Sequence, residues 1–111
     1  MDLQPAQFGD YALHYRTEDT GTSKYDHVVE AHHEGERVGY LNWQGTTGRV
    51  LNVDVDDAHQ RKGVATAMWN HANSLPGVRK PKHSGHRTPK GDAWSKSVGG
   101  PRPRNTRNDP L

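Results

Sequence analysis

The chain contains no cysteine, and no apolar run in its 111 residues approaches the ~20 residues that a membrane-spanning helix needs. Without cysteine, neither a disulfide nor a thiolate-bound metal can form. The N-terminal sequence MDLQPAQFGD has neither a basic start nor an apolar stretch, so we do not expect a secretory signal. These absences predict a cytoplasmic protein that does not enter a membrane.

Apolar residues are also scarce. They make up 30% of the chain, compared with roughly 45–50% in average globular domains. A chain of 111 residues is expected to form one small domain with a small core. We predict an N-terminal arm (1–9), one folded domain (10–100) and a disordered basic tail (101–111), whose sequence PRPRNTRNDPL has almost nothing to bury.

Acidic residues are nearly missing from the second half of the chain. Residues 58–111 hold 2 Asp/Glu and 11 Lys/Arg, whereas residues 1–57 hold 11 Asp/Glu and 4 Lys/Arg. The charges of +9 and −7 sum to the net charge of +2. A basic half suits an anionic ligand, either a nucleotide phosphate or a nucleic acid.

Hydrophobic alternation predicts an antiparallel meander in the first half. In the last strand, Val53 and Val55 share a face, and Asp54 lies on the other face. Short turns containing glycine separate the segments. The expected strands are 10–18, 25–33, 37–44 and 49–55.

The period then becomes helical. Apolar and small residues recur at helical spacing from Val64 to Leu75, before Pro76-Gly77 ends the helix. Thr88-Pro89 is typical of a helix start, with Thr88 as the N-cap. That second helix should bury Trp94 and Val98 and end at Gly99-Gly100. Between the helices, residues 78–84 contain a proline and predict only a short fifth strand at a sheet edge.

The junction between the last strand of the meander and the first helix is rich in small and basic residues. It reads Gln60-Arg61-Lys62-Gly63-Val64-Ala65-Thr66. The free N–H groups and positive dipole end of a helix start attract anions. Gly63 leaves the backbone approachable, and Arg61 and Lys62 add positive charge. A pyrophosphate fits this arrangement, but so does a tight turn with two solvated cations.

With its preceding strand, the run VDVDDAHQRKGVATAM resembles the acetyl-CoA-binding motif of the GCN5-related N-acetyltransferase (GNAT) superfamily. The resemblance implies an α+β fold with a mixed, mainly antiparallel sheet of about five strands and two helices. The usual first two helices and last two strands are lacking. Relative to the family pattern, Asp57 stands where a proline is often found.

The resemblance also implies a function, the transfer of an acetyl group from acetyl-CoA to a primary amine. The acceptor would be a small molecule or a protein, and a homodimer is compatible with the pattern. The backbone of Val53, Asp54 and Val55 would pair with the pantetheine arm. The pyrophosphate would lie against the first helix, with Thr66 adding a hydroxyl. The implied pyrophosphate contacts are Gln60, Arg61, Lys62, Gly63, Val64, Ala65 and Thr66.

The groups that move protons are less defined. Arg49 occupies the place of a family glutamate base, and Trp94 stands on the helix that often carries a tyrosine acid. His83, Ser84 and Asp54 are the catalytic candidates, because His83 and Ser84 should lie beside the thioester and histidine titrates near neutral pH. His83 could equally be a surface histidine and Asp54 a solvated carboxylate.

The segment 82–100 resembles one found in small acetyltransferase-like proteins of actinobacteria and their phages. Four polar side chains gather before its helix: His83, Ser84, His86 and Arg87. They could contact an anion, either the 3′-phosphoadenosine end of the cofactor or the acceptor. Alternatively, they form a polar loop that caps the helix.

Three other functions compete with acetyl transfer. The eight histidines suggest a metal site, but His27 and His33 would lie about 20 Å apart on one strand face, so we expect none. An inactive GNAT-like module that binds coenzyme A or a protein is a second possibility. The third, a basic nucleic-acid-binding protein, lacks a groove-reading element, so nucleic acid is the less favoured partner.

Overall fold

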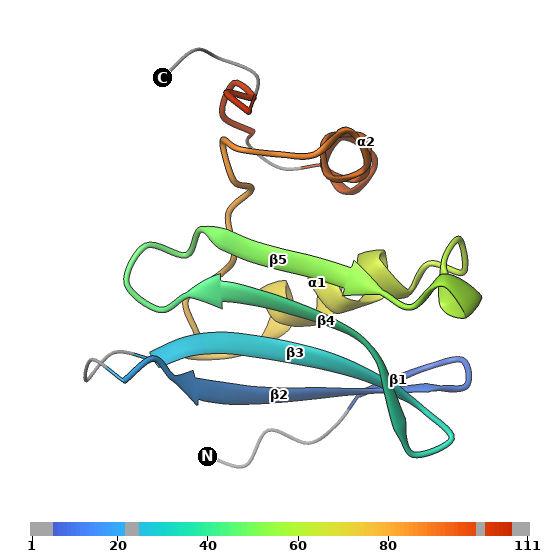
Figure 1. Ribbon diagram of the computed structural model, residues 1–111. Helices are drawn as coiled ribbons and strands as arrows, with labels where there is room; N and C mark the ends of the chain where they lie inside the picture. Colours follow the sequence, from blue (N-terminus) through green and yellow to red (C-terminus); the bar gives the residue numbers. More distant parts are fainter. Residues whose placement is uncertain (1–5, 22–24, 100–101, 108–111) are drawn as a thin grey trace.

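The computed structural model describes residues 6–21, 25–99 and 102–107. A five-stranded antiparallel sheet in chain order carries one helix against its face and a second helix beyond one edge, which confirms the α+β class (Figure 1). The elements are β1 (Ala6–Phe8), β2 (Tyr11–Asp19), β3 (Tyr25–His33), β4 (Glu36–Gln44), β5 (Val50–Val55), the 3-10 turn η1 (Asp57–His59), α1 (Val64–Ser74) and α2 (Pro89–Val98).

The four predicted strands of the meander are confirmed as β2 to β5, each within one residue at either end. Turn chemistry fixes their register. The hairpin between β3 and β4 turns at Glu34 and Gly35, whose φ angles are 51° and 83°. Positive φ at both central residues is the geometry that matches the twist of a tight hairpin. His33 consequently pairs with Glu36 across the turn.

The first strand was not predicted, because β1 lies inside the expected N-terminal arm. Phe8 pairs with Tyr11 across the two-residue turn at Gly9 and Asp10. Gly9 has a φ of 55°, and a glycine at the first central position is itself a hairpin signal. The rest of the arm, residues 1–5, lies outside the described residues.

The predicted fifth strand at 78–84 is reduced to a single parallel bridge between Arg49 and Lys82. The Val50 N–H donates to the Lys82 carbonyl at 2.9 Å, and the Lys82 N–H donates to the Gly48 carbonyl at 2.7 Å. On the side before Lys82, Pro81 has no N–H to extend this pairing, and the described residues after Lys82 form no further bridge to β5. The described sheet therefore has β5 at its edge, and most of that edge carries no partner strand.

The core lies between α1 and the sheet. Leu41, Trp43 and Met68 are fully buried there, and burying each such side chain contributes roughly 1.5–3 kcal/mol. The indole N–H of Trp43 donates to the Arg79 carbonyl at 2.7 Å, which ties the segment after α1 to the sheet. The helical stripe that begins at Val64 is the face that α1 buries, as its spacing predicts.

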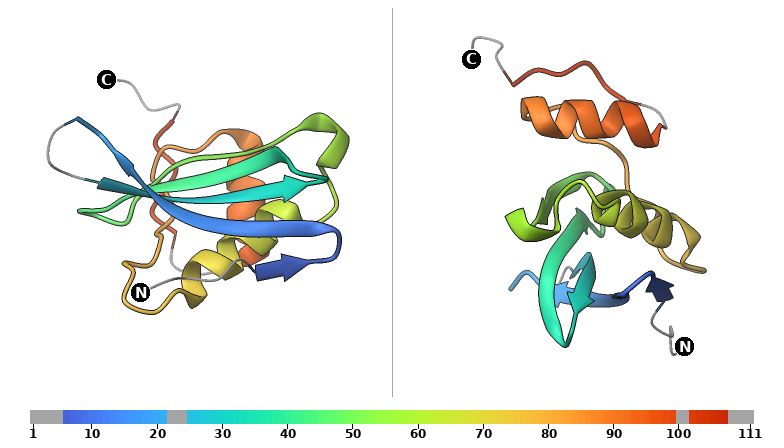
Figure 2. Two further views of the ribbon diagram at one scale, coloured as in Figure 1. Left: turned by 90° about the horizontal axis from the view of Figure 1, so that it is seen from below. Right: turned by 90° about the vertical axis from the view of Figure 1, so that its right-hand side faces the viewer.

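The second helix, α2, lies beyond the β5 edge (Figures 1 and 2). The Thr88 hydroxyl caps it by accepting from the Gly91 N–H at 3.0 Å, as predicted. Trp94 packs edge-on against Trp69 of α1, with ring centroids 5.5 Å apart. This contact at one side of α2 leaves a hollow between the helix and β5.

Residues 102–107 of the expected disordered tail have a defined place against the loop before α2. The Thr106 N–H donates to the Gly85 carbonyl at 2.7 Å, and Asn105 exchanges hydrogen bonds of 3.0 Å with the backbone of Arg87. Polar side chains hold this segment, so its lack of apolar residues did not reveal the docking.

No helix in the described part of the chain is long and apolar enough to cross a bilayer.

Gly45, which directly follows β4, tests how tightly the chain packs against the start of β3 at Tyr25. A methyl group at this position would fall on the Tyr25 carbonyl oxygen, and a rigid backbone cannot give way as a flexible side chain can. We expect Gly45→Ala to lower the free energy of unfolding by about 2 kcal/mol or more, as overpacking does. Urea denaturation measures the change. Gly85→Ala is the control, because its new methyl meets its nearest neighbours at 3.6 Å and should change stability by no more than about 0.5 kcal/mol.

Candidate functional site

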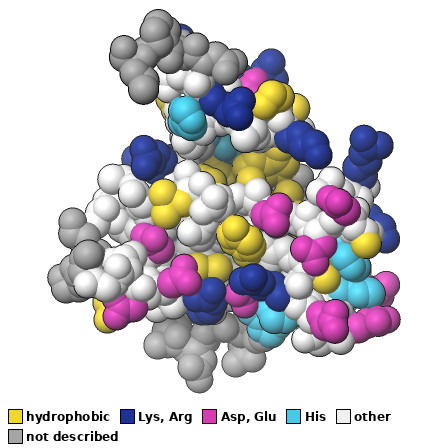
Figure 3. Space-filling view, in the orientation of Figure 1, with side chains coloured by type: hydrophobic (Ala, Val, Ile, Leu, Met, Phe, Trp, Pro, Cys, Tyr) yellow, Lys and Arg dark blue, Asp and Glu magenta, His cyan; other side chains and the backbone are white. Residues whose placement is uncertain are grey.

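A cavity of about 440 Å³ lies between the open edge of β5 and the first turn and a half of α2. We call it the larger cavity, because a smaller one of about 170 Å³ lies farther along β5. Figure 3 shows apolar side chains in this hollow, basic side chains above it and to its right, and acidic side chains below it. Its lining residues are Val53, Asp54, Val55, His59, Gln60, Arg61, Gly63, Val64, Ala65, Thr66, Thr88, Lys90, Gly91 and Trp94.

The backbone of β5 faces this cavity. The Asp56 N–H donates to the Val38 carbonyl at 2.8 Å, toward β4. Because bonding direction alternates along an antiparallel pair, Val53 and Val55 turn their N–H and C=O groups outward. The Gln60 side chain donates to the Val55 carbonyl from that side at 2.9 Å. The edge thus offers peptide groups to an extended ligand.

The loop from β5 to α1 presents a concave run of backbone. Arg61 and Gly63 both have positive φ, 62° and 82°. For Arg61 this left-handed conformation costs roughly 1–2 kcal/mol. Such strain gathers at ligand-binding loops, and alternating backbone conformations make anion-binding nests.

The amides of this loop and of the first turn of α1 are available. Among the residues that the structure describes, no backbone N–H from Arg61 to Thr66 donates a hydrogen bond. Arg61 and Lys90 approach the same space from two different elements. The region therefore offers unpaired donors and positive charge together.

Nine of the ten residues predicted to bind the cofactor line this one cavity. The exception is Lys62, which is exposed and does not contribute to the lining. Sequence reasoning missed the α2 residues Thr88, Lys90, Gly91 and Trp94, because no local pattern indicates that α2 lies across from β5. The indole N–H of Trp94 is buried without a partner among the described residues.

His59 was also missed, although it precedes the motif directly. The Tyr11 hydroxyl lies 2.9 Å from its Nδ1, and the His33 ring lies 5.0 Å away between centroids. Its Nε2 forms no hydrogen bond to a described residue, and His59 lines the larger cavity. The alternating pattern places Tyr11 and His33 on one sheet face, but the sequence does not reveal that η1 brings His59 to them.

A smaller cavity of about 170 Å³ continues along β5 toward Val50. It shares part of its wall with the larger cavity, so the two form one cleft. The shared residues are Val53, Thr88, Gly91 and Trp94. The other lining residues are Val50, Leu51, Asn52, His83, Ser84, His86, Arg87 and Ser95.

His83 is a buried packing residue as well as part of this cleft, and only 5% of it is exposed. Its ring stacks on Trp69 at 4.2 Å and meets Trp94 edge-on at 5.7 Å. Its Nε2 donates to the Gly99 carbonyl at 2.8 Å, so Nδ1 is the free nitrogen. Burial lowers the pKa of His83, with Arg87 acting in the same direction and the Gly99 carbonyl opposing. The interpretation as a surface histidine is wrong, because the two indole rings cover it.

The other two catalytic candidates differ in their surroundings. Ser84 lines the smaller cavity, but its hydroxyl accepts from the His86 N–H at 3.0 Å and is used in a local turn. Asp54 is exposed and lines the larger cavity. The cleft therefore unites all three candidates along β5, with His83 and Ser84 in the smaller cavity.

No group of three metal-ligating side chains occurs within residues 6–21, 25–99 and 102–107. His27 instead pairs through Nδ1 with the Tyr15 hydroxyl at 2.8 Å. Burial lowers the pKa of His27 and raises that of Tyr15. Both groups stay neutral near pH 7, as suits a packed aromatic pair.

No protein-family model matches the chain, and no curated protein or solved structure is significantly similar to it. The geometry and chemistry of the cleft are therefore the basis for assigning a function.

The lowered pKa of His83 makes stability depend on pH. The unfolded chain takes up a proton at this histidine near pH 6.5, whereas the folded chain resists until lower pH. The contribution of neutral His83 to the free energy of unfolding is thus complete above about pH 6.5. This contribution is lost as the pH falls below that value. We expect the Tm of the wild type to fall between pH 7.5 and 5.5, and less steeply in His83→Phe, which keeps an aromatic ring but cannot titrate.

Scanning calorimetry across this range measures both profiles. The exposed His86 provides the control, since His86→Gln should reproduce the wild-type slope. Parallel profiles for wild type and His83→Phe would contradict the assignment. His27 and His71, whose pKa values burial also lowers, account for the slope that remains in His83→Phe.

Proposed function

We propose that the chain binds acetyl-CoA in the cleft beside β5 and transfers the acetyl group to a primary amine. The observation that carries the proposal is one juxtaposition. The backbone edge at Val53 and Val55 has no partner strand among the described residues, and only the Val55 carbonyl accepts a bond, from Gln60. This edge and the unpaired amides at Arg61 to Thr66 open into the same cavity. An extended amide chain that ends in a pyrophosphate matches both halves of this surface.

Each part of the cleft has a distinct binding task. The amides from Arg61 to Thr66 hold the pyrophosphate at the helix dipole. The outward peptide groups of Val53 and Val55 pair with the amides of the pantetheine arm, as an added strand would. Lys90 supplies charge from the opposite wall. A cytoplasmic location belongs to the same proposal.

The transfer itself needs one bond to form, one bond to break and two protons to move. The amine nitrogen attacks the thioester carbon, a C–N bond forms, and the C–S bond breaks. The nitrogen loses one proton and the departing thiolate gains one, so amide and free thiol result. Outward N–H groups on β5 can stabilise the developing oxyanion. His83, neutral at pH 7 with Nδ1 free, can accept a proton, whereas the positions of Arg49 and Trp94 offer neither base nor acid.

The second candidate function is an inactive module that binds acetyl-CoA without transferring its acetyl group. The lack of a base at Arg49 and of an acid at Trp94 favours this candidate. The two candidates share the cofactor site but differ in turnover. Thiol release with a panel of primary amines separates them, because only the transferase releases coenzyme A in proportion to amine.

Lys90 and Lys96 allow a matched test of the cofactor site, since both are exposed on α2 but only Lys90 lines the larger cavity. We expect Lys90→Glu to weaken acetyl-CoA binding about tenfold or more, because a carboxylate would face the phosphates. Lys96→Glu should bind like the wild type. Isothermal titration of acetyl-CoA into the three proteins gives the dissociation constants.

A second variant tests the loop directly. Gly63→Glu places a carboxylate on the amide run, and binding should be lost, although the variant is strained at its φ of 82° and its folding is checked by circular dichroism. Absence of acetyl-CoA binding by the wild type would refute the proposal. Equal effects of Lys90→Glu and Lys96→Glu would place the phosphates elsewhere.

A further inference from the structure

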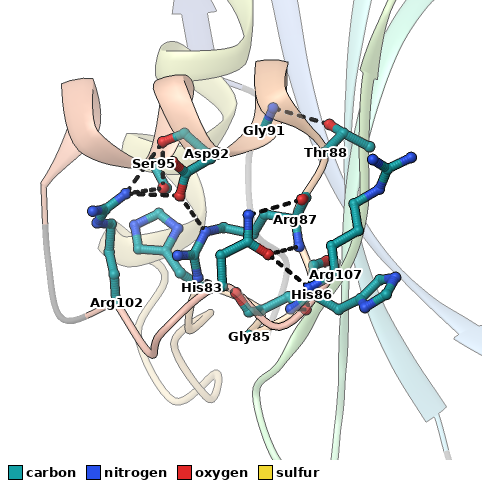
Figure 4. Close-up of polar contacts among 12 residues, drawn as sticks. His83, Gly85, His86, Arg87, Thr88, Gly91, Asp92, Ser95, Arg102 and Arg107 are labelled. Atoms are coloured by element: carbon teal, nitrogen blue, oxygen red, sulfur yellow. Dashed lines mark hydrogen bonds and ion pairs between the residues drawn. The ribbon is translucent and has the colours of Figure 1, made fainter. Parts of the chain in front are cut away.

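A cluster of two arginines and one aspartate lies at the wall of the smaller cavity (Figure 4). Arg87 donates through Nε to Asp92 Oδ1 at 2.9 Å, and Arg102 donates through Nη1 to the same oxygen at 3.1 Å. Both guanidinium groups lower the pKa of Asp92, the hydrogen bond from Arg87 most of all. Asp92 is therefore ionised, and the cluster carries one positive charge in excess.

No other acidic side chain within the described ranges pairs with either arginine. Asp92 is also the only acidic residue between positions 58 and 108 of the sequence. Arg87 is 7% exposed and shares its one carboxylate partner with Arg102, so its buried charge is only partly compensated, which is costly. Within the described residues, this excess charge has no further anionic partner, which leaves the wall suited to an anionic ligand.

One nitrogen of Arg87 is placed to meet such an anion. Nε binds Asp92 and Nη1 binds the Ser84 carbonyl. Nη2 has no hydrogen bond to the described residues. The fully enclosed side-chain atoms without a partner do not include Nη2, so this nitrogen keeps some exposed surface. Arg87 lines the smaller cavity beside His83 and Trp94. A guanidinium with a free N–H in a cavity wall is a typical carboxylate donor.

We infer that the smaller cavity binds a carboxylate of the substrate, with Arg87 as the charged donor. The position of this carboxylate rests on the proposed function. If the pyrophosphate lies at Arg61 to Thr66, the arm runs along β5 from Val55 toward Val50. Its reactive end then reaches the smaller cavity, and the 3′-phosphoadenosine lies at the opposite end of the cleft.

A carboxylate next to the reactive end has two possible sources with the same chemistry. It belongs either to the amine acceptor, which is then an amino acid, or to the acyl group, which is then a dicarboxylic acid joined to coenzyme A. Both place an anion near Arg87.

The binding claim is tested without coenzyme A, so that its outcome is separate from that of the proposed function. Sodium propionate is titrated into ¹⁵N-labelled protein, with neutral propionamide as the matched probe. The Trp94 indole cross-peak should shift saturably with propionate and much less with propionamide. The Trp43 indole, which lines neither cavity, should not move. No saturable shift of Trp94, or equal shifts with both probes, would overturn the inference.

Arg87→Gln identifies the donor. Arg102 still neutralises Asp92 in this variant, so the fold should persist, as the spectrum itself shows. Propionate affinity should fall about tenfold or more. Arg107→Gln, an exposed arginine outside the cavity lining, should retain it. Should Arg87→Gln not fold, Arg87→Lys keeps the charge but loses the fork, and an unchanged affinity in that variant would contradict the guanidinium contact.

The source is decided by turnover. Acetyl-CoA with glycine against methylamine, and malonyl-CoA against acetyl-CoA with methylamine, differ only in one carboxylate. A preference of about tenfold in kcat/KM for the carboxylate partner, lost in Arg87→Gln, identifies which substrate carries it. If no pair turns over but propionate still binds, the transferase proposal fails and the carboxylate site stands. If the wild type turns over both pairs without preferring the carboxylate-bearing substrate in either, the substrate assignment is overturned.

Discussion

The cleft depends on one aromatic contact, the His83 ring stacked flat on Trp69 with the edge of Trp94 against both. This contact is the main apolar link between α2 and the rest of the domain, and it lies to one side of β5. These ring contacts thus hold α2 near the β5 edge without using the backbone groups of that edge. The resting imidazole is neutral here, because burial and the nearby charges of Arg87 and Arg102 all lower the pKa of His83.

An unpaired sheet edge is normally a liability, since it invites pairing with another chain. Here the parallel pairing that the structure describes goes no further than the bridge between Arg49 and Lys82, while α2 and the Gln60 side chain shield the exposed groups without satisfying most of them. A positive rim at Arg61 and Lys90 accompanies that edge. An unpaired edge, a positive rim and a strained loop together lower the stability of the domain. Binding sites commonly carry such a cost, and the surrounding scaffold offsets it.

Sequence periodicity predicted the elements well where the pattern was long. The two-residue alternation gave β2 to β5, and the stripe from Val64 gave α1, because burial of one face governs both. It failed for β1, a short strand whose only signal was the Gly9-Asp10 turn. The amide run at 60–66 was predictable from local helix chemistry. The opposite wall was not, because Lys90 and Trp94 reach the cleft through tertiary packing, and His83 became buried only through two tryptophans far apart in sequence.

The order of the sheet has a consequence for how the domain moves. Each strand pairs with its neighbour in the chain, and α1 covers the same sheet, so these parts form one cooperative unit with short-range contacts. The second helix and residues 102–107 are held by His83 and the polar cluster around Asp92 instead. The two walls of the cleft therefore belong to units of unequal stability. Local opening of the weaker unit gives a bulky ligand access while the sheet stays folded, and a ligand that touches both walls joins them into one.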